Sequence, residues 1–290
     1  MGADKPSLGY RIFTVGNYTL FVILGLSMLM PILNLLAKSL SDKQAIIEEK
    51  VYFLPVGLHL DNYISILNSG AMPKAFLITV YITLLGTLLN LIFTGLTAYP
   101  LAKQDLKGRS FFMFLIVFTM IFGAPMIPNY LLVKSLGLIN SLWSLMIPGL
   151  ISAFNLILVR TFFMGLPSEL FDAARIDGCS EWRILWGIAL PLSVPVFVTV
   201  GLFYAVGHWN TYQSAILYLN KSSLYTLQVV LRQMIVESDV SGMADKGVSE
   251  SIMPEGIKAA AVIFATVPIL CVYPFLQKYF IKGSLLGSVK

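Results

Sequence analysis

The charged side chains with the most informative spacing in this sequence lie between two long apolar stretches. Six of them fall between Glu169 and Arg183, whereas the flanking residues 135–159 and 184–207 carry none. The chemistry that such groups offer is ionic contact with a polar partner. We therefore expect residues 166–185 to form a cytosolic docking surface between two membrane spans.

The motifs of catalysis are missing from the sequence. It holds no GxxxxGK-S/T phosphate loop, no HExxH and no GxSxG, and no Asp or Glu lies within a proposed span. An ion-coupled secondary transporter usually needs intramembrane ionisable groups, although sodium sites can be built from carbonyls and hydroxyls. We expect no catalytic residue. Secondary transport is disfavoured rather than excluded, and an intramembrane hydrolase is disfavoured more strongly.

Cysteine and histidine are too sparse to indicate a metal site. Cys179 and Cys271 are far apart in the expected topology, and no Cys/His spacing matches a metal motif, so we expect both to be packing residues. His59 and His208 fall near aromatic residues on the outer side, where a surface or interfacial position is favoured over a catalytic one. The sequence therefore predicts no metal and no cofactor bound by this chain.

Composition and apolar runs predict the elements that carry the charged segment. Apolar residues make up 57% and charged residues 12% of the chain, against about 45–50% and 25% in soluble domains. Runs of about 20 uncharged residues can cross a bilayer as helices. We expect residues 1–290 to form a single transmembrane domain with six spans, at about 17–38, 75–101, 110–131, 138–160, 186–207 and 258–278. A cleaved signal peptide is the alternative for the first run, but that run is too long.

The basic residues favour both termini in the cytosol. With that orientation, eleven of the twenty Lys and Arg residues lie inside, as the positive-inside rule requires. The residues do not cluster with aromatics on a polar face, so nucleic acid is not an expected partner. Residues 39–73 and 208–257 become outer loops, and residues 279–290 a cytosolic tail. The second outer loop is expected to touch a partner, with a connector without a role as the alternative.

Caps and glycine predict a helix-turn-helix within the charged segment. Ser168 is expected to cap a first helix, which Gly178 ends with positive φ. Ser180 can cap a second helix, and Pro191 and Pro195 begin the next span. The result is an L-shaped pair of arms on the inner face.

This stretch resembles the EAA motif of ABC importer permeases, in which EAA is followed by DG and, after a fixed gap, by I-x-LP. The matching residues are Asp172-Ala173-Ala174, Asp177-Gly178, Ile188 and Leu190-Pro191. Two departures stand out. Asp172 is one methylene shorter than the family's Glu, which implies a longer or rearranged salt bridge to the ATPase, and Cys179 replaces a common Ala.

The resemblance implies an all-α polytopic membrane protein with the type I ABC importer permease fold. In that family two permeases pair, two cytosolic ATPase subunits use ATP and Mg, and an extracytoplasmic solute-binding protein delivers the solute. We expect a heterodimer in the bacterial plasma (inner) membrane. By the same resemblance, ATPase coupling falls on Asp172, Ala173, Ala174, Asp177, Gly178, Leu190 and Pro191. The ATPase-interface tail comprises Gly283, Ser284, Gly287 and Ser288, and the binding-protein contact comprises Ser241, Gly242 and Gly247.

The resemblance also narrows the cargo. The segments FLPVGLHLDNY, HWNTYQSAILYL and YTLQVVLRQ and the ending QKYFIKGSLLGSVK resemble carbohydrate permeases of the maltose-transporter type, especially those for oligo- and polysaccharides. A polyamine or amino acid is the alternative cargo, and a membrane scaffold the alternative without transport. Polar or aromatic residues that could contact sugar are Asn90, Asn155, Tyr204, Trp209, Tyr212 and Gln213, although interhelical Asn bonds are also common in membranes.

Overall fold

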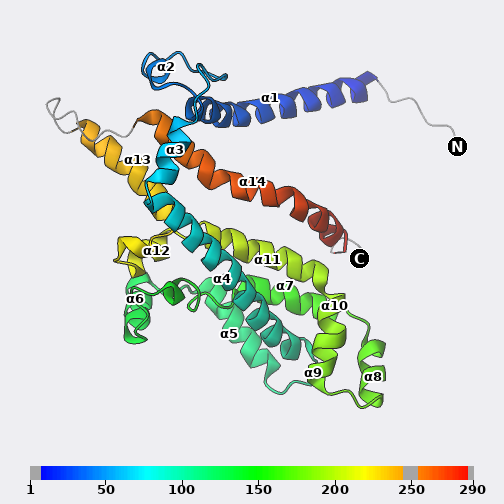
Figure 1. Ribbon diagram of the computed structural model, residues 1–290. Coiled ribbons are helices and arrows are strands. Elements are labelled where there is room, and N and C mark those ends of the chain that lie inside the picture. The colour runs from blue at the N-terminus through cyan, green and yellow to red at the C-terminus, as the bar shows by residue number, and fades with distance from the viewer. Residues whose placement is uncertain (1–7, 244–253, 287–290) are drawn as a thin grey trace. The chain divides into compact units, whose positions relative to one another are not determined.

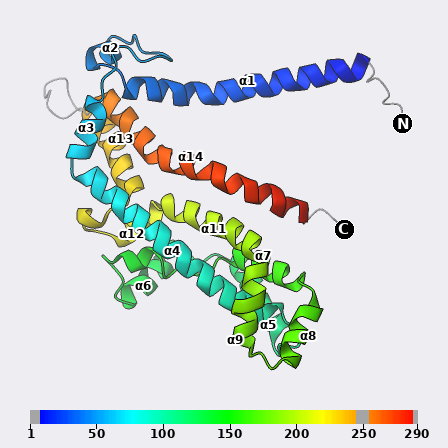
Figure 2. The same ribbon diagram turned by 45° about the vertical axis from the view of Figure 1, so that its right-hand side comes forward.

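The structure is a computed structural model that describes residues 8–243 and 254–286, and that part of the chain contains helices and no strand. It divides into two compact units (Figures 1 and 2). Unit 1 comprises residues 1–70 and 233–266, and unit 2 comprises residues 71–232 and 267–290. The expected all-α class is confirmed.

Unit 1 holds the first long apolar helix and a short polar subdomain. Its helices are α1 (Leu8–Ser39), α2 (Lys43–Ile47), α3 (Asp61–Asn68) and the first turns of α14 (Glu255–Leu286). Polar contacts join them: Lys38 pairs with Glu255 at 2.9 Å, and Asn62 Nδ2 donates to the carbonyl of Ser39 at 3.1 Å. The expected outer loop 39–73 is therefore a folded segment.

Unit 2 is organised around one long helix. This helix, α4 (Ala71–Ala102), packs along α7 (Ala153–Met164) and α11 (Val194–Trp209). Their shared core is apolar and includes Ala98, Leu101, Leu156, Val159, Phe163, Ile184, Val196 and Val200. Such a core fixes the positions of polar groups on its three helices.

The third apolar run is bent instead of straight. It forms α5 (Arg109–Ile121) and α6 (Met126–Ser135), which meet at 118°. Pro125 stands at the N-cap of α6, and a proline disfavours α geometry in the residue before it. The expected continuous helix over residues 110–131 is thus broken at the segment that contains Gly123 and Pro125.

The fourth run departs most from the expected helix over 138–160. Residues 142–145 form a short 3₁₀ turn, η1 (Leu142–Leu145), and α-helix begins only at Ala153, the first residue of α7. Pro148 and Gly149 interrupt the run, and both are poor interior helix residues. Ser152 then caps α7 by accepting from the backbone N–H of Asn155 at 3.5 Å. Regular α-helix therefore covers only residues 153–160 of this run.

The fifth run is bent by 80° at Ser193. It comprises α9 (Glu181–Ile184), the π-helical turn η2 (Leu185–Ala189), α10 (Leu190–Leu192) and α11. Pro191 has no backbone N–H, so the carbonyl of Gly187 lacks its α-helical donor. This loss accounts for the irregular turn that precedes the bend.

The remaining helices of the described chain are α8 (Ser168–Ile176), α12 (Gln213–Tyr218), η3 (Ser222–Leu224) and α13 (Leu227–Met243). Within the second expected outer loop, α13 continues to Met243. Apolar residues at helical spacing, Leu227, Val230, Leu231 and Met234, explain its start. Ser241 and Gly242 end this helix, and Gly283 and Ser284 lie near the end of α14, whereas Gly247, Gly287 and Ser288 lie outside the described residues.

Up to six crossing segments are available in the described chain. The helices α1, α4 and the first part of α14 are each long and apolar enough to cross a membrane, and the total rises to six if each of the three bent helix pairs, which begin with α5, α7 and α9, contributes one span. The protein is therefore an all-α polytopic membrane protein with six transmembrane segments.

Candidate functional site

The charged segment forms two short helices joined by a tight turn, and Figure 2 separates them clearly. Pro167 occupies the N-cap of α8 without a side-chain hydrogen bond. Ser168 is already the first helical residue, so the expectation that Ser168 caps this helix is wrong. Glu169 lies in the first turn, where the helix dipole favours a negative charge.

Gly178 makes the turn between the two helices. Its φ of +73° lies in the left-handed region, and its N–H donates to the carbonyl of Arg175 at 3.0 Å. Cys179 N–H closes the turn on the carbonyl of Ala174 at 2.9 Å. Ser180 then caps α9, since its Oγ accepts from Arg183 N at 3.4 Å. Both the glycine turn and the second cap are confirmed.

The side chains of α8 divide into an inner and an outer set. Asp172, Ala173 and Asp177 are exposed. Ala174, which the sequence assigns to ATPase coupling, is only 6% exposed and packs into the core of unit 2, so its side chain faces this chain's own core and not the exposed side of α8. Ile176, which the motif does not mark, is 87% exposed. A large exposed apolar side chain beside two exposed carboxylates is typical of a contact surface.

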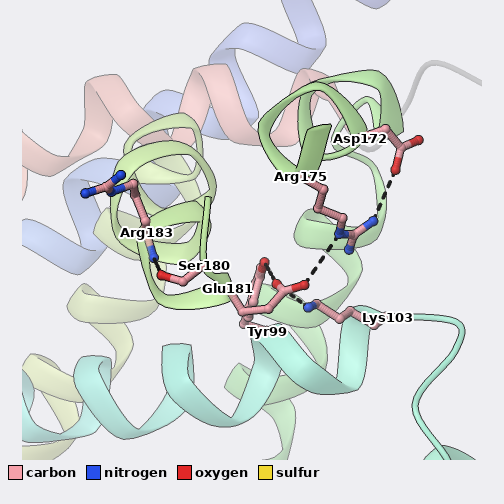
Figure 3. Close-up of polar contacts among 7 residues, drawn as sticks. All are labelled: Tyr99, Lys103, Asp172, Arg175, Ser180, Glu181 and Arg183. Carbon is pink, nitrogen blue, oxygen red and sulfur yellow. Dashed lines mark hydrogen bonds and ion pairs between the residues drawn. The ribbon is translucent and has the colours of Figure 1, made fainter. Parts of the chain in front are cut away.

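Three side chains converge on the carboxylate of Glu181 (Figure 3). Tyr99 Oη donates to Oε2 at 2.8 Å, and Lys103 forms an ion pair with the same oxygen. Arg175 Nε lies 3.4 Å from Oε1, and Arg175 Nη1 lies 3.1 Å from Asp172 Oδ1. Tyr99 belongs to the last turn of α4, so these contacts tie α8 and α9 to the end of that helix.

The surroundings of Glu181 favour its ionised form. Partial burial opposes its ionisation, but the hydrogen bonds from Lys103 and Tyr99 and the nearby positive charges hold the pKa of Glu181 below its usual value. The residue precedes the apolar part of the fifth run. The sequence motif does not mark it, and only its acidic character within a charged segment could have drawn attention to it.

Glu181→Gln is expected to lower the stability of the folded protein by up to about 1 kcal/mol, because the ion pairs with Lys103 and Arg175 are partly exposed and screened. Thermal unfolding of the detergent-solubilised protein at low and high salt measures the effect, which salt should reduce. Arg183→Gln is the matched control, since the Arg183 side chain forms no ion pair within the described residues. Equal losses of stability in both variants would show that the ion pairs of Glu181 do not stabilise the folded protein.

The last residues of the motif sit where the fifth run bends. Leu190 and Pro191 lie in α10, and Ile188 lies in the π-helical turn before it. Leu190 packs against the core of unit 2. These residues therefore link the charged arms to α11.

The polar residues expected along a sugar pathway are only partly brought together. Asn90, Asn155 and Tyr204 lie on α4, α7 and α11, which pack together. Trp209 ends α11 and makes an edge contact with Phe76. Tyr212 lies under the guanidinium of Arg232, 5.0 Å from the ring centre, and Gln213 begins α12. Trp209, Tyr212 and Gln213 therefore lie outside the core that α4, α7 and α11 share.

His208 was expected at a surface or interface, and the structure corrects this. Its ring is buried in unit 2 at 8% exposure, and Nε2 lies 2.7 Å from Asn90 Oδ1. Gly86 makes room, since a Cβ there would lie 2.6 Å from Nε2. The pairing joins residues 118 positions apart, which no local sequence pattern reveals.

Tyr204 is held by a second set of buried bonds. Its hydroxyl lies 2.8 Å from Thr94 Oγ1 and accepts from the backbone N–H of Ser152 at 3.0 Å. Two helices and the segment before α7 are thereby fixed to one another. A hollow of about 490 Å³ opens beside these groups.

Apolar segments that can cross a membrane, an exposed charged helical turn between two of them and buried polar groups define a polytopic membrane protein. The chain belongs to the family of binding-protein-dependent transport system inner membrane components, whose model matches residues 92–284. The match includes the charged segment and both packing partners of α4.

Relatives and solved structures agree with this assignment. The polygalacturonan/rhamnogalacturonan transport system permease protein YtcP of Bacillus subtilis (strain 168) is 43% identical, over 97% of this chain and 99% of its own. A chain of a bacterial ABC transporter that imports the acidic polysaccharide alginate has a TM-score of 0.88 and 33% identity, covering 96% of this chain and all of that one. A chain of the alginate transporter in complex with a pentasaccharide-bound periplasmic protein shares the fold, with a TM-score of 0.58 at 15% identity over 92% and 93% of the two chains.

Proposed function

We propose that this chain is a permease subunit of an ATP-driven importer for oligosaccharides or polysaccharide fragments. Family membership supports the permease role, and the relatives' printed substrates support a saccharide. Both named relatives carry acidic polymers, galacturonan-type and alginate, so acidic fragments are the favoured cargo. An extracytoplasmic binding protein delivers the fragment, as the family description and the solved alginate complex support.

The observation that carries the coupling role is the exposed turn of α8 and Gly178. It presents Asp172, Asp177 and the apolar Ile176 outward, while Ala174 anchors the same helix inward. A surface of this kind suits docking into a groove of a cytosolic ATPase subunit. Arg175 Nη1 already lies 3.1 Å from Asp172 Oδ1, so a basic group of the partner has to compete with an internal ion pair.

The direction of coupling follows from linkage. ATP closes the partner ATPase dimer, which displaces the docked turn and favours one orientation of the spans over the other. Only contacts that differ between the two states can transmit this work. Both termini and the docked turn lie in the cytosol, as the basic residues favour, and ATP and Mg are bound by the ATPase subunits. This chain transmits the work and catalyses no reaction.

Purification of the complex from its native membrane tests the proposal. A tagged copy of this chain, gently solubilised, is expected to bring with it a P-loop ATPase and a second permease of the same family, identified by mass spectrometry. Reconstituted with its binding protein, the complex is expected to take up trigalacturonate when ATP is enclosed. Recovery of the chain alone, with uptake driven by an ion gradient in liposomes, would establish a secondary carrier instead.

A further inference from the structure

A small polar pocket opens in unit 2, between the start of α5 and the last turns of α7. Its volume is about 480 Å³. Its lining includes Gln104, Leu106, Arg109, Ser110, Met113 and Arg160, and no acidic residue of the described chain contributes to it. We call it the arginine pocket, because its two charged side chains are both guanidinium groups. A pocket with this charge attracts an anion.

The two arginines are held in place but are not neutralised. Arg160 Nε donates to the carbonyl of Leu101 at 2.9 Å, and Arg109 Nη2 lies 3.5 Å from Met164 Sδ. Neither guanidinium forms an ion pair with a carboxylate in the part of the chain that the structure describes. Burial and the nearby charge of Arg109 both disfavour the positive charge of Arg160. An anion bound between the two arginines supplies the missing counter-charge.

The arginine pocket lies at the end of unit 2 that carries the charged turn. Leu101, which accepts from Arg160, stands two residues before Lys103, which pairs with Glu181. The apolar helix α5 begins at Arg109, so the pocket lies where that helix enters the membrane. The proposed function places this end on the cytosolic side, whose leaflet carries the negative surface charge.

A strip of apolar side chains continues from the pocket along α5. Arg109, Met113, Val117 and Met120 follow one another at intervals of four, four and three residues, so they share one side of the helix. Val117 and Met120 are exposed, and no residue of α5 is buried within this chain. The helix rises about 16 Å from Arg109 to Met120, close to the ~15 Å depth of one hydrocarbon leaflet. A charged group at the head of an apolar strip of this length fits a phospholipid.

We propose that the arginine pocket binds the phosphate of an anionic phospholipid of the cytosolic leaflet between Arg109 and Arg160, with an acyl chain along the exposed side of α5. Guanidinium groups match phosphate oxygens in geometry as well as charge, and basic pockets between transmembrane helices on the cytosolic side hold anionic headgroups. A free phosphate ion or a uronate shares the charge but makes no use of the apolar strip. Only the choice of leaflet rests on the proposed function.

A lipid at this position connects three helices. Arg109 begins α5, Arg160 lies near the end of α7, and Leu101 lies near the end of α4. Only residues 165–167 separate α7 from α8, the first helix of the charged turn. The bound lipid therefore stabilises the frame from which the charged turn projects.

Arg109→Gln tests the site in the complex as it is purified from its native membrane. Glutamine stays polar but carries no charge, and Arg109 is preferred to Arg160 because the fold uses the bond from Arg160 to Leu101. Native mass spectrometry of the delipidated complex measures its affinity for phosphatidylglycerol and for phosphatidylcholine. The wild type is expected to prefer phosphatidylglycerol, and the variant to bind it about ten- to hundredfold more weakly, as the loss of a hydrogen bond to a charged group requires. Lipid sites on other subunits cancel in this comparison.

Lys107→Gln is the matched control. It removes one positive charge from the same loop, but Lys107 does not line the pocket, so its loss of affinity should not exceed about fivefold, the contribution of one basic residue near anionic lipid. Arg109→Lys keeps the charge and should recover part of the affinity, whereas a folding defect would not be rescued in this way. Equal losses in Arg109→Gln and Lys107→Gln would overturn the site, as would equal affinity of the wild type for the two lipids.

Soluble anions distinguish a lipid from other ligands of the same charge. Inorganic phosphate and trigalacturonate have no acyl chain, so neither should displace phosphatidylglycerol at an equal concentration. Displacement by phosphate would assign the arginines to a free anion, and displacement by trigalacturonate would assign them to the solute route; either result overturns the lipid site. A complex that lacks an ATPase or takes up no saccharide would refute the proposed function instead, and the lipid affinities would stay as expected.

Discussion

Gly178→Val is expected to remove the ATPase subunits from the purified complex while leaving this chain in the membrane. Gly178 has a φ of +73° and no atom within 4 Å of an added Cβ, so the cost lies in the backbone alone. Left-handed geometry costs an ordinary residue roughly 1–2 kcal/mol, and a β-branched residue suffers most. The turn that orients α8 against α9 then opens, and ATPase recovered per permease should fall about five- to thirtyfold, since 1.4 kcal/mol corresponds to a factor of ten.

The chain offers a matched control for this backbone strain. Gly137 has a φ of +69°, again with nothing within 4 Å, but it follows α6 rather than α8. Gly137→Val should keep the ATPase subunits, and Gly178→Asn should keep most of them because Asn tolerates left-handed geometry. If Gly137→Val and Gly178→Val detach the ATPase equally, the loss reflects general misfolding, and the docking assignment is wrong.

Local signals in the sequence predicted the charged turn well. Gly178 and Ser180 act through bonds to residues three or four positions away, so glycine and cap preferences suffice to find them. The prediction that Ser168 caps α8 was wrong because Pro167 occupies the N-cap position, so the helix already includes Ser168. The burial of Ala174 could not be predicted, because a short motif does not show which face of α8 packs against the core of unit 2.

The intramembrane polar groups could not be predicted in this way. Asn90, Asn155 and Tyr204 stood out as polar residues in apolar runs, but the partners of Asn90 and Tyr204 come from distant segments of the chain. The segment from Pro148 to Ser152 was expected to be helical. Because it is irregular instead, its backbone groups are free to form hydrogen bonds with the side chains of Asn90 and Tyr204. His208 gave no signal, because its burial depends on the absence of a side chain at Gly86.

One helix connects the two regions of unit 2. Tyr99 near the end of α4 bonds to Glu181, and Asn90 on the same helix holds His208. Nine residues of α-helix separate them, which corresponds to about 14 Å along the axis. A displacement of the charged turn therefore reaches the hollow through a single rigid element, the kind of connection that coupling between distant sites needs.

Gly86→Ala is expected to destabilise this chain more than any other Gly→Ala change in unit 2. The added Cβ would lie 2.6 Å from His208 Nε2 and 2.8 Å from Cε1. The ring cannot move aside without breaking its bond to Asn90, so overpacking costs about 1–3 kcal/mol. The loss of that buried hydrogen bond adds about 1 kcal/mol. Thermal unfolding and the yield of folded protein in detergent measure the combined effect.

A double-mutant cycle and a neighbouring glycine identify the cause of the loss. Gly207→Ala, on α11 next to His208 with nothing within 4 Å of the added Cβ, should be neutral or slightly stabilising. In a His208→Ala background the clash partner is gone, so Gly86→Ala should add no further destabilisation. If Gly86→Ala destabilises equally with and without the imidazole, the packing of α4 on α11 limits this position by another contact, and the His208–Asn90 pair does not set the spacing of the two helices.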